Sequence, residues 1–409
     1  MEFMQAKQKI PIFLILFTLF VDVMGFGIII PVLPKLIREL TGGSISEASQ
    51  LGGWLMFAFS FPLFLFSPFM GSLSDRFGRR PILLISLFGL CLDSLLQGFA
   101  PSMIWLFVGR TLSGVMGASF SIVYSYIADI TTQEERAEKF GLLGAAFGMG
   151  FIVGPILGGL LGPFGSRVPF FVAAGISFLN CILAFFFLPE SLSEENKRPF
   201  ELKRANPIGS LMNLKKYPSI YGLLFVLLLL NISHQAVRTT WTFYVSEKFS
   251  WDEKTIGYSL AMIGLMYAFV QGGLITPLLN LFGRNLTIYI GFVFYIIGNI
   301  LFGIATEGWM MFLFVIPYAL GGMEEPPLQS LISSKVAENE QGQLQGTIMS
   351  IISISAIIGP VLMSEVFAYF TKPTAPIYLP GAPLFLSAVL TLGCLISVYF
   401  SLRKDKSGS

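Results

Sequence analysis

Charged residues are scarce in this chain of 409 residues. Only 12% of the residues are charged, against roughly 25% in soluble domains. Histidine occurs once and cysteine three times, and the cysteines lie in apolar runs without the spacing of metal ligands. The net charge of +2 gives no general attraction to polyanions. These absences exclude a string of soluble domains, a disulfide-rich secreted protein, a disordered chain and a nucleic-acid binder.

Hydrophobic residues, at 54% of the chain, gather in long apolar segments. A helix needs about 20 such residues to cross a bilayer. Charge clusters and turn residues separate twelve segments of this length, and the sequence therefore predicts an all-α membrane protein with twelve transmembrane helices. These helices are expected at 10–33, 51–72, 81–100, 103–127, 140–162, 168–188, 218–244, 255–279, 286–305, 308–333, 343–368 and 380–402.

Lysine and arginine set the expected orientation. With both termini in the cytoplasm, the inner loops hold about three times as many of these residues as the outer loops. This bias predicts a multi-pass protein whose two termini are cytoplasmic.

The sequence repeats itself at an offset of 205 residues. The Phe-Gly-Arg tripeptide at 77–79 recurs at 282–284, and the Gly-Pro pair at 154–155 recurs at 359–360. The offset is about half the chain, which indicates two parallel repeats of six helices. This architecture is typical of alternating-access transporters, which bind substrate between the repeats near the bilayer midplane.

A long polar and basic loop divides the two predicted repeats. It predicts an N-terminal six-helix bundle at 1–188, a cytoplasmic loop at 189–217 and a C-terminal six-helix bundle at 218–409.

The segment Gly-Ser-Leu-Ser-Asp-Arg-Phe-Gly-Arg-Arg at 71–80 resembles the loop signature of the major facilitator superfamily. Its glycines, Gly71 and Gly78, permit a tight turn and close helix approach. Its acid can cap a helix or pair with a cation, and its arginines favour the cytoplasmic side. A basic topogenic loop would explain the arginines alone. The resemblance implies a latch of the outward-facing state, with an acid at the end of helix 4 as partner; Asp129 occupies that place.

Residues 150–159, Gly-Phe-Ile-Val-Gly-Pro-Ile-Leu-Gly-Gly, resemble the helix 5 signature of the drug–proton antiporters in this superfamily. Small residues let helices pack closely, and a proline permits a bend; simple packing is the alternative interpretation. Arg110 matches the helix 4 arginine of the same group, although it could also be a permanently paired arginine. The residues expected to govern conformational gating are Gly71, Asp75, Arg76, Gly78, Arg79, Asp129, Gly154 and Pro155.

Segments 22–34, 74–81, 319–322 and 343–346, with Trp241, resemble the tetracycline-exporter branch. The resemblance covers nearly the whole chain and implies a proton-driven exporter in a bacterial inner membrane.

One departure from that branch concerns proton coupling. Those exporters use a histidine in helix 8 and an acid in helix 9. This chain has Tyr267 at the expected histidine position, and no acid between Asn285 and Thr306. The prediction of the major facilitator fold and of an antiporter is unaffected by this departure. The resemblance does not, however, imply that tetracycline is the substrate.

Ionisable residues inside predicted spans are functional candidates by default. Asp22 lies about 18 Å along helix 1, near the midplane, where it would bind a proton or a cationic substrate, or else form a fixed hydrogen bond. His234 and Arg238 share a face of helix 7 at i, i+4 spacing. Glu324 and Glu325 lie at a break that two prolines predict in helix 10. The proton-coupling candidates are Asp22, Asp93, Glu324 and Glu325. The substrate-binding candidates are Asp22, Arg110, His234, Gln235, Arg238, Gln271 and Glu324.

These features favour a proton-coupled antiporter that exports amphipathic, drug-like compounds. Its partners would be a small-molecule substrate, protons and the lipid bilayer, without a cofactor or metal, and we expect it to work as a monomer. The alternative within transport is proton-coupled movement, including uptake, of a polar or carboxylate-bearing metabolite or siderophore. A non-transporting sensor would need extramembrane domains or lost buried charges, and an enzyme would need a catalytic constellation; the sequence has none of these.

Overall fold

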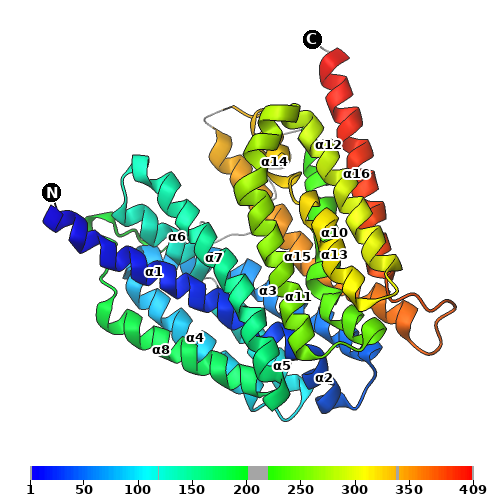
Figure 1. Cartoon of the computed structure of the whole chain (residues 1–409). Coiled ribbons are helices and arrows are strands. Elements are labelled where there is room, and N and C mark those ends of the chain that lie inside the picture. The colour runs from blue at the N-terminus through cyan, green and yellow to red at the C-terminus, as the bar shows by residue number, and fades with distance from the viewer. Residues whose placement is uncertain (1, 118, 201–219, 338–339, 408–409) are drawn as a thin grey trace. The chain divides into compact units, whose positions relative to one another are not determined.

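A computed structural model describes residues 2–117, 119–200, 220–337 and 340–407, and these residues form helices and connecting turns without a β-strand. Residues 201–217 of the predicted central loop lie outside this description. The helices before that loop are α1 (Glu2–Ile29), η1 (Ile30–Val32), α2 (Leu33–Thr41), α3 (Ile45–Phe77), α4 (Arg79–Gly98), α5 (Met103–Met116), α6 (Ser119–Ile130), α7 (Gln133–Leu161), η2 (Gly162–Phe164), α8 (Val168–Phe187) and η3 (Glu194–Asn196). Those after it are α10 (Tyr221–Phe249), α11 (Glu253–Phe269), the π-helical turn η6 (Val270–Leu274), α12 (Ile275–Ile304), α13 (Gly308–Gly321), α14 (Glu325–Ser333), α15 (Gln341–Thr371) and α16 (Ala382–Ser407) (Figure 1).

Ten stretches of helix in the described residues are long and apolar enough to cross a membrane. One of them, Glu253–Ile304, has 52 residues, or about 78 Å of helix, more than twice the hydrocarbon core of a bilayer. It contains Gly283 in a non-helical conformation (φ 70°, ψ 167°), where α12 changes direction. The helix predicted at 308–333 is two short helices, α13 and α14, and the break expected at the Glu-Glu-Pro-Pro segment is confirmed.

The chain folds into two compact units. The first unit contains Met1–Gly42, Ala58–Asn206 and Asp252–Ala261, and the second contains Gly43–Phe57, Pro207–Trp251 and Met262–Ser409. Residues 43–57 therefore belong to the second unit although the residues after them belong to the first. Residues 252–261 belong to the first unit although the residues after them belong to the second. In the first unit, Glu253 pairs with Lys35 at 2.9 Å. In the second, Glu365 accepts a hydrogen bond from Gln50 at 3.0 Å.

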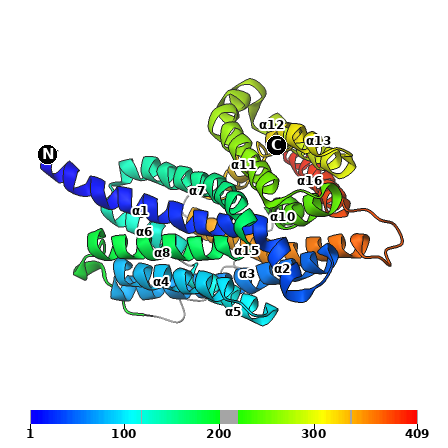
Figure 2. The same cartoon turned by 60° about the horizontal axis from the view of Figure 1, so that its bottom comes forward.

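Within the first unit, α1 packs against α7 and α8, and α4 packs against α8 and α5; α1, α4 and α8 run side by side in both views (Figures 1 and 2). Within the second unit, α10 packs against α15 and α16, and α12 against α13 and α16. Each unit has its own buried cluster of aliphatic and aromatic side chains. The ionisable candidates thus lie on helices whose positions are fixed by extensive apolar packing.

Glycines bring α1 and α7 into backbone contact. Gly150, Gly154 and Gly158 form a stripe of four-residue period that faces the α1 backbone at Phe20, Met24 and Ile28. A Cβ on Gly154 would lie 2.7 Å from the carbonyl oxygen of Met24. The Gly-rich signature is therefore an α1 contact surface, as expected where small residues drive helix association. This contact holds the stretch of α1 that carries Asp22.

We predict opposite effects of alanine at two glycines of α7. Gly154→Ala should destabilise the protein by about 1–3 kcal/mol, because the new methyl group collides with the α1 backbone. Gly144→Ala should stabilise it by up to about 1 kcal/mol through helix propensity, since a Cβ there meets no atom within 4 Å. The midpoint of thermal unfolding in detergent measures both. Equal stability of the two variants would rule out close α1–α7 packing.

Candidate functional site

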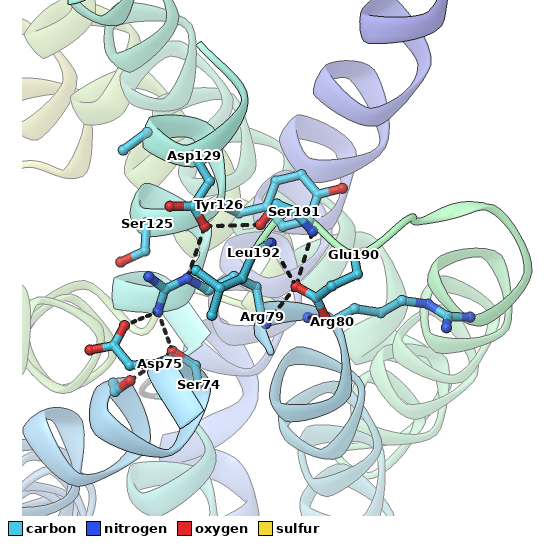
Figure 3. A network of polar contacts seen from close by, with 12 residues as sticks. Ser74, Asp75, Arg79, Arg80, Ser125, Tyr126, Asp129, Glu190, Ser191 and Leu192 are labelled. Atoms are coloured by element: carbon cyan, nitrogen blue, oxygen red, sulfur yellow. Dashed lines mark hydrogen bonds and ion pairs between the residues drawn. The ribbon is translucent and has the colours of Figure 1, made fainter. Parts of the chain in front are cut away.

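The loop between α3 and α4 contains a charge cluster built on a glycine. Gly78 has φ 104° and ψ 155°, a conformation that disfavours a side chain, and it separates the two helices. Arg79, the next residue, is 8% exposed and forms ion pairs with Asp75 and with Asp129 of α6, the latter at 3.0 Å (Figure 3). Its Nη1 also donates to Ser74 Oγ at 2.7 Å. The contact expected between this loop and Asp129 is present.

Glu190 completes this cluster and was missed by the sequence reasoning. Its Oε1 accepts hydrogen bonds from the backbone N–H groups of Arg79 at 2.8 Å and Leu192 at 3.0 Å, and its Oε2 accepts from that of Arg80 at 3.1 Å (Figure 3). The carboxylate therefore lies at the positive N-terminal end of α4. A signal existed: α4 begins after Gly78, which has no side chain to cap it, so the capping acceptor had to come from elsewhere.

The first residues after α8 are attached to the same cluster. Ser191 Oγ donates to Asp129 at 3.0 Å, and Tyr126 Oη donates to the carbonyl oxygen of Pro189 at 2.8 Å. The backbone N–H of Arg198 donates to the carbonyl oxygen of Asp75 at 3.1 Å. The start of the loop predicted at 189–217 is thus part of the charge cluster.

Two of the expected gating residues lie apart from these contacts. Arg76 is exposed, with its guanidinium 5.0 Å from the ring centroid of Phe77. A Cβ on Gly71 would meet no atom within 4 Å, so the close helix approach expected there is wrong for this structure. Arg76 is exposed at the end of α3, and among the described residues the side chain that pairs with Asp75 and Asp129 is that of Arg79.

A cavity of about 210 Å³ in the first unit brings together three candidates that are remote in sequence: Asp22, Asp93 and Arg110. All three are buried. Asp22 Oδ2 accepts a hydrogen bond from Ser119 Oγ at 3.3 Å, while Oδ1 has no partner in the described part of the chain. Asp93 Oδ1 accepts from Gln97 Nε2 at 2.6 Å.

Arg110 does not close an ion pair with either acid among the residues described. Its guanidinium lies 5.7 Å from the ring centroid of Phe26, in a cation–π position. With both carboxylates ionised, the cavity would hold one excess negative charge. Since an uncompensated buried charge is costly, this arrangement favours binding of a proton or a cation.

The second unit places His234 and Glu324 together. Both are buried, and His234 Nε2 lies 3.2 Å from Glu324 Oε1. His234 and Arg238, which share a face of α10, differ in their partners. The carboxyl group of Glu324 lies beside His234, whereas Arg238, one helical turn further on, is exposed and forms no ion pair or hydrogen bond among the described residues.

The remaining candidates of this unit differ in burial. Glu325 is half-buried and accepts a hydrogen bond from Gln329 at 3.4 Å. Gln235 is buried against Gly359 of α15. A Cβ on Gly359 would lie 2.5 Å from the Cγ of Gln235. Gln271 is exposed on η6, and a π-helical turn inside a helix often marks a functional position.

Two aromatic rings near the His234–Glu324 pair, those of Tyr295 and Tyr318, were also missed, whereas Tyr267 was singled out only as the residue at the expected histidine position. The ring centroid of Tyr295 lies 4.9 Å from that of His234, and Tyr318 contacts both Tyr295 at 5.2 Å and Tyr267 at 5.7 Å. These tyrosines come from α12, α13 and α11. Nothing in their local sequences distinguishes them from ordinary aromatic packing residues.

The family profile of the Major Facilitator Superfamily matches residues 15–360 and 223–408. The chain belongs to the major facilitator superfamily. This confirms the family expected from the loop at 71–80, and it makes the chain a multi-pass membrane transporter rather than an enzyme.

The relatives include resistance proteins. The class C tetracycline resistance protein of Escherichia coli is 36% identical over 362 residues, which cover 88% of this chain and 91% of that protein. Multidrug resistance protein 2 of Bacillus subtilis is 30% identical over 371 residues, covering 88% and 90%. The similarity to the tetracycline-exporter branch is thereby confirmed.

Among solved structures, the nucleoside transporter NupG superposes with a TM-score of 0.79 at 11% identity, covering 96% of this chain and 99% of that chain. At this identity the likeness concerns the fold, which is that of the family.

We predict that the charge cluster between α3 and α4 controls turnover rather than affinity. Arg79→Ala and Glu190→Gln should each slow transport about fivefold or more, because loss of about 1 kcal/mol from one conformation changes the populations of states by that factor. Substrate affinity should change by less than about twofold. Initial rates and substrate binding in proteoliposomes measure the two effects.

Arg76→Ala is the matched control, since this arginine lies in the same loop outside the ion pairs. It should transport at close to the wild-type rate. Weakened binding with normal turnover in Arg79→Ala, or an equal defect in Arg76→Ala, would contradict the role of the cluster.

Proposed function

We propose that this protein is a proton-coupled antiporter that exports amphipathic, drug-like compounds from the cytoplasm by alternating access. Family membership and the resemblance to tetracycline and multidrug resistance proteins support this function. The observation that carries the proton coupling is the cavity in which Asp22, Asp93 and Arg110 meet. We further propose that the protein works as a monomer in a bacterial inner membrane, with both termini in the cytoplasm.

The proposed architecture is twelve helices in two parallel repeats. Helices α5 and α13 begin 205 positions apart and end 205 positions apart, at the offset of the sequence repeat. Gly78 and Gly283, also 205 apart, both have positive φ and extended ψ. In both halves the helix after this glycine is followed by a helix that stops early and is continued by a second short helix. These matches support a common ancestral six-helix unit.

Antiport follows if a proton and the substrate compete for the same negative charge. Asp22 is the better placed of the two acids, because its Oδ1 has no hydrogen-bond partner in the part of the chain that the structure describes, while Asp93 accepts a hydrogen bond from Gln97. A substrate cation would displace the proton, and the proton would displace the substrate when the cavity is exposed to the other side. The apolar lining, which includes Phe26, Phe59 and Phe147, suits the hydrophobic body of such a compound.

A carboxylate-bearing cargo is the second candidate, and Arg238 favours it. An exposed guanidinium on a membrane-spanning helix, with no counter-charge among the described residues, is suited to bind a carboxylate bidentately. Counterflow in proteoliposomes against tetracyclines, other antibiotics and carboxylate siderophores would decide between these cargo classes.

Asp22→Asn should reduce proton-gradient-driven transport at least tenfold, because it removes the titratable group and keeps its shape. Everted membrane vesicles with an imposed pH gradient and the cargo identified by counterflow give the measurement. Glu307→Gln, which neutralises an exposed acid outside the cavity, should leave transport unchanged. Full gradient-driven transport by Asp22→Asn would exclude Asp22 as the proton site.

Arg238→Ala should lower transport of the true cargo at least tenfold, or about 1.4 kcal/mol, whereas Arg238→Lys should retain part of the activity because it keeps the charge without the bidentate geometry. Tetracycline should be a poor substrate of the wild type, since Tyr267 stands where its exporters are expected to have histidine. Resistance assays and transport rates test both parts. Strong tetracycline resistance that persists unchanged in Arg238→Ala would refute them.

A further inference from the structure

Glu324 lies at the break between α13 and α14, in a fully enclosed position. Its side chain is 0% exposed, and α12 approaches it closely because Gly291 has no side chain: a Cβ there would lie 2.8 Å from both Cβ and the backbone N of Glu324. Oε1 is 3.2 Å from His234 Nε2, and Oε2 has no hydrogen-bond partner among the described residues. One half of a completely buried carboxyl group is therefore unsatisfied.

No permanent cation reaches this carboxyl group. Its single ion-pair contact in the described residues is His234, an imidazole that gains or loses its charge near neutral pH. Arg238 shares the face of α10 but is exposed. The other ionisable groups around the pair are Tyr267 of α11, Tyr295 of α12, Tyr318 of α13, Glu325 of α14 and Cys394 of α16. Apart from Arg238, none of these can supply a positive charge.

A buried carboxylate beside a neutral imidazole carries a net negative charge, which a low-dielectric site strongly disfavours. One proton removes that charge, either as a carboxylic acid beside neutral imidazole or as a carboxylate beside imidazolium. Both forms keep the hydrogen bond between Oε1 and Nε2. The pair therefore has one net-neutral composition, which holds one exchangeable proton.

We propose that His234 and Glu324 form a second proton-binding site, in the second unit and separate from the Asp22 cavity. Its role in coupling rests on the proposed antiport function, while its capacity to bind a proton does not. Glu324, rather than its neighbour Glu325, is the acid of this site, and Tyr295 positions the imidazole through its ring contact.

The two proton sites occupy related places in the two halves. Ser119 and Glu324 are 205 positions apart, and each lies at the break after the shortened helix, α5 or α13. Each also contacts the first helix of its half: Ser119 donates to Asp22 of α1, and Glu324 meets His234 of α10. Thus the acid lies on the first helix in one half and at the helix break in the other. This relation places both sites at comparable positions along their repeats.

The chain has one histidine, so histidine-selective ¹⁵N labelling gives a spectrum of His234 alone. The wild-type protein, purified through a tag without histidine and held in lipid nanodiscs, would be titrated from about pH 5 to pH 9, the range in which imidazole groups respond. If the pair binds a proton, the Nε2 signal must change with pH. The imidazole becomes charged, or Nε2 switches from donor to acceptor as Oε1 becomes protonated, or the proton binds Oε2 and Nε2–H then donates to a neutral carboxyl group in place of a carboxylate.

Glu324→Gln should abolish this titration, whereas Glu325→Gln, which removes a nearby charge but keeps the pair, should preserve the titration with a shifted midpoint. Infrared difference spectra of the carboxyl stretch give an independent readout: Glu324→Gln should remove one titrating component, and Asp22→Asn a different one. Should Glu324→Gln not fold, the wild-type titration and the Asp22→Asn and Glu325→Gln spectra still decide.

A wild-type Nε2 signal that stays constant over the range would overturn the proposal and make the pair a fixed structural hydrogen bond. So would a titration that Glu325→Gln alters and Glu324→Gln does not. Because neither measurement needs a transported substrate, failure of the proposed export function would leave these results interpretable.

Discussion

A polar group inside a lipid bilayer must find its partner within the protein, because hydrocarbon offers neither water nor hydrogen bonds. The whole described chain follows from this constraint. Its backbone is helical, its small residues allow helices to touch, and its buried ionisable side chains, such as those of Asp22, Asp93, His234 and Glu324, lie in a cavity or a pair. The α1–α7 contact shows the connection: Gly154 lets the two backbones meet, and this fixes the α1 segment from which Asp22 enters the cavity. The glycine that allows the helices to pack closely thus also determines where the charged side chain of Asp22 lies.

The charge cluster between α3 and α4 shows how the N–H groups of a helix end find an acceptor where the local sequence offers no cap. A glycine is needed at position 78 for its positive φ, and a glycine brings no side chain to the free N–H groups of α4. Glu190, from the end of α8, supplies the acceptor. The corresponding turn of the second half has a different contact. Arg284 donates a hydrogen bond to Ser334 at 3.1 Å. These two positions lie 205 residues after Arg79 and Asp129. The acid present in the first half is a serine in the second, so the ion pair exists on one side of the repeat only.

This asymmetry extends to the buried charges. The first half carries two acids and an arginine around one cavity, and the second carries a histidine–glutamate pair enclosed by tyrosines. The two halves thus hold different chemistry. Of the α7 glycines that contact α1, Gly154 recurs 205 residues later as Gly359, whereas the buried Asp22, Asp93 and Arg110 do not recur as ionisable residues. Export and proton coupling are proposed from these differences, and the fold alone would support many substrates.

The sequence by itself determined the class of the protein. Long apolar segments are sufficient to predict membrane helices, because apolar length is a local feature of the sequence. The offset of 205 residues predicted the two repeats, because a constant spacing between similar motifs can be seen without a structure. It also identified Asp22, Asp93, Arg110, His234 and Glu324 as exceptional, since any charge inside an apolar segment requires an explanation. The break in the helix at 308–333 was predictable from two consecutive prolines, which cannot donate to a helical ladder.

Only the tertiary structure decided which of these residues meet. Glu190 and the tyrosines around His234 have unremarkable neighbours in sequence, and their roles arise from helices that are distant along the chain. Glu324 and Glu325 are adjacent and chemically alike, yet one is enclosed and the other half-buried, because successive residues at a helix start point in different directions. His234 and Arg238 share a face of α10, yet His234 is the one that pairs with Glu324, because the two residues lie one helical turn apart and only His234 is level with the buried carboxyl group. Helix rotation and depth are set by packing against neighbouring helices, and no single segment of sequence contains that information.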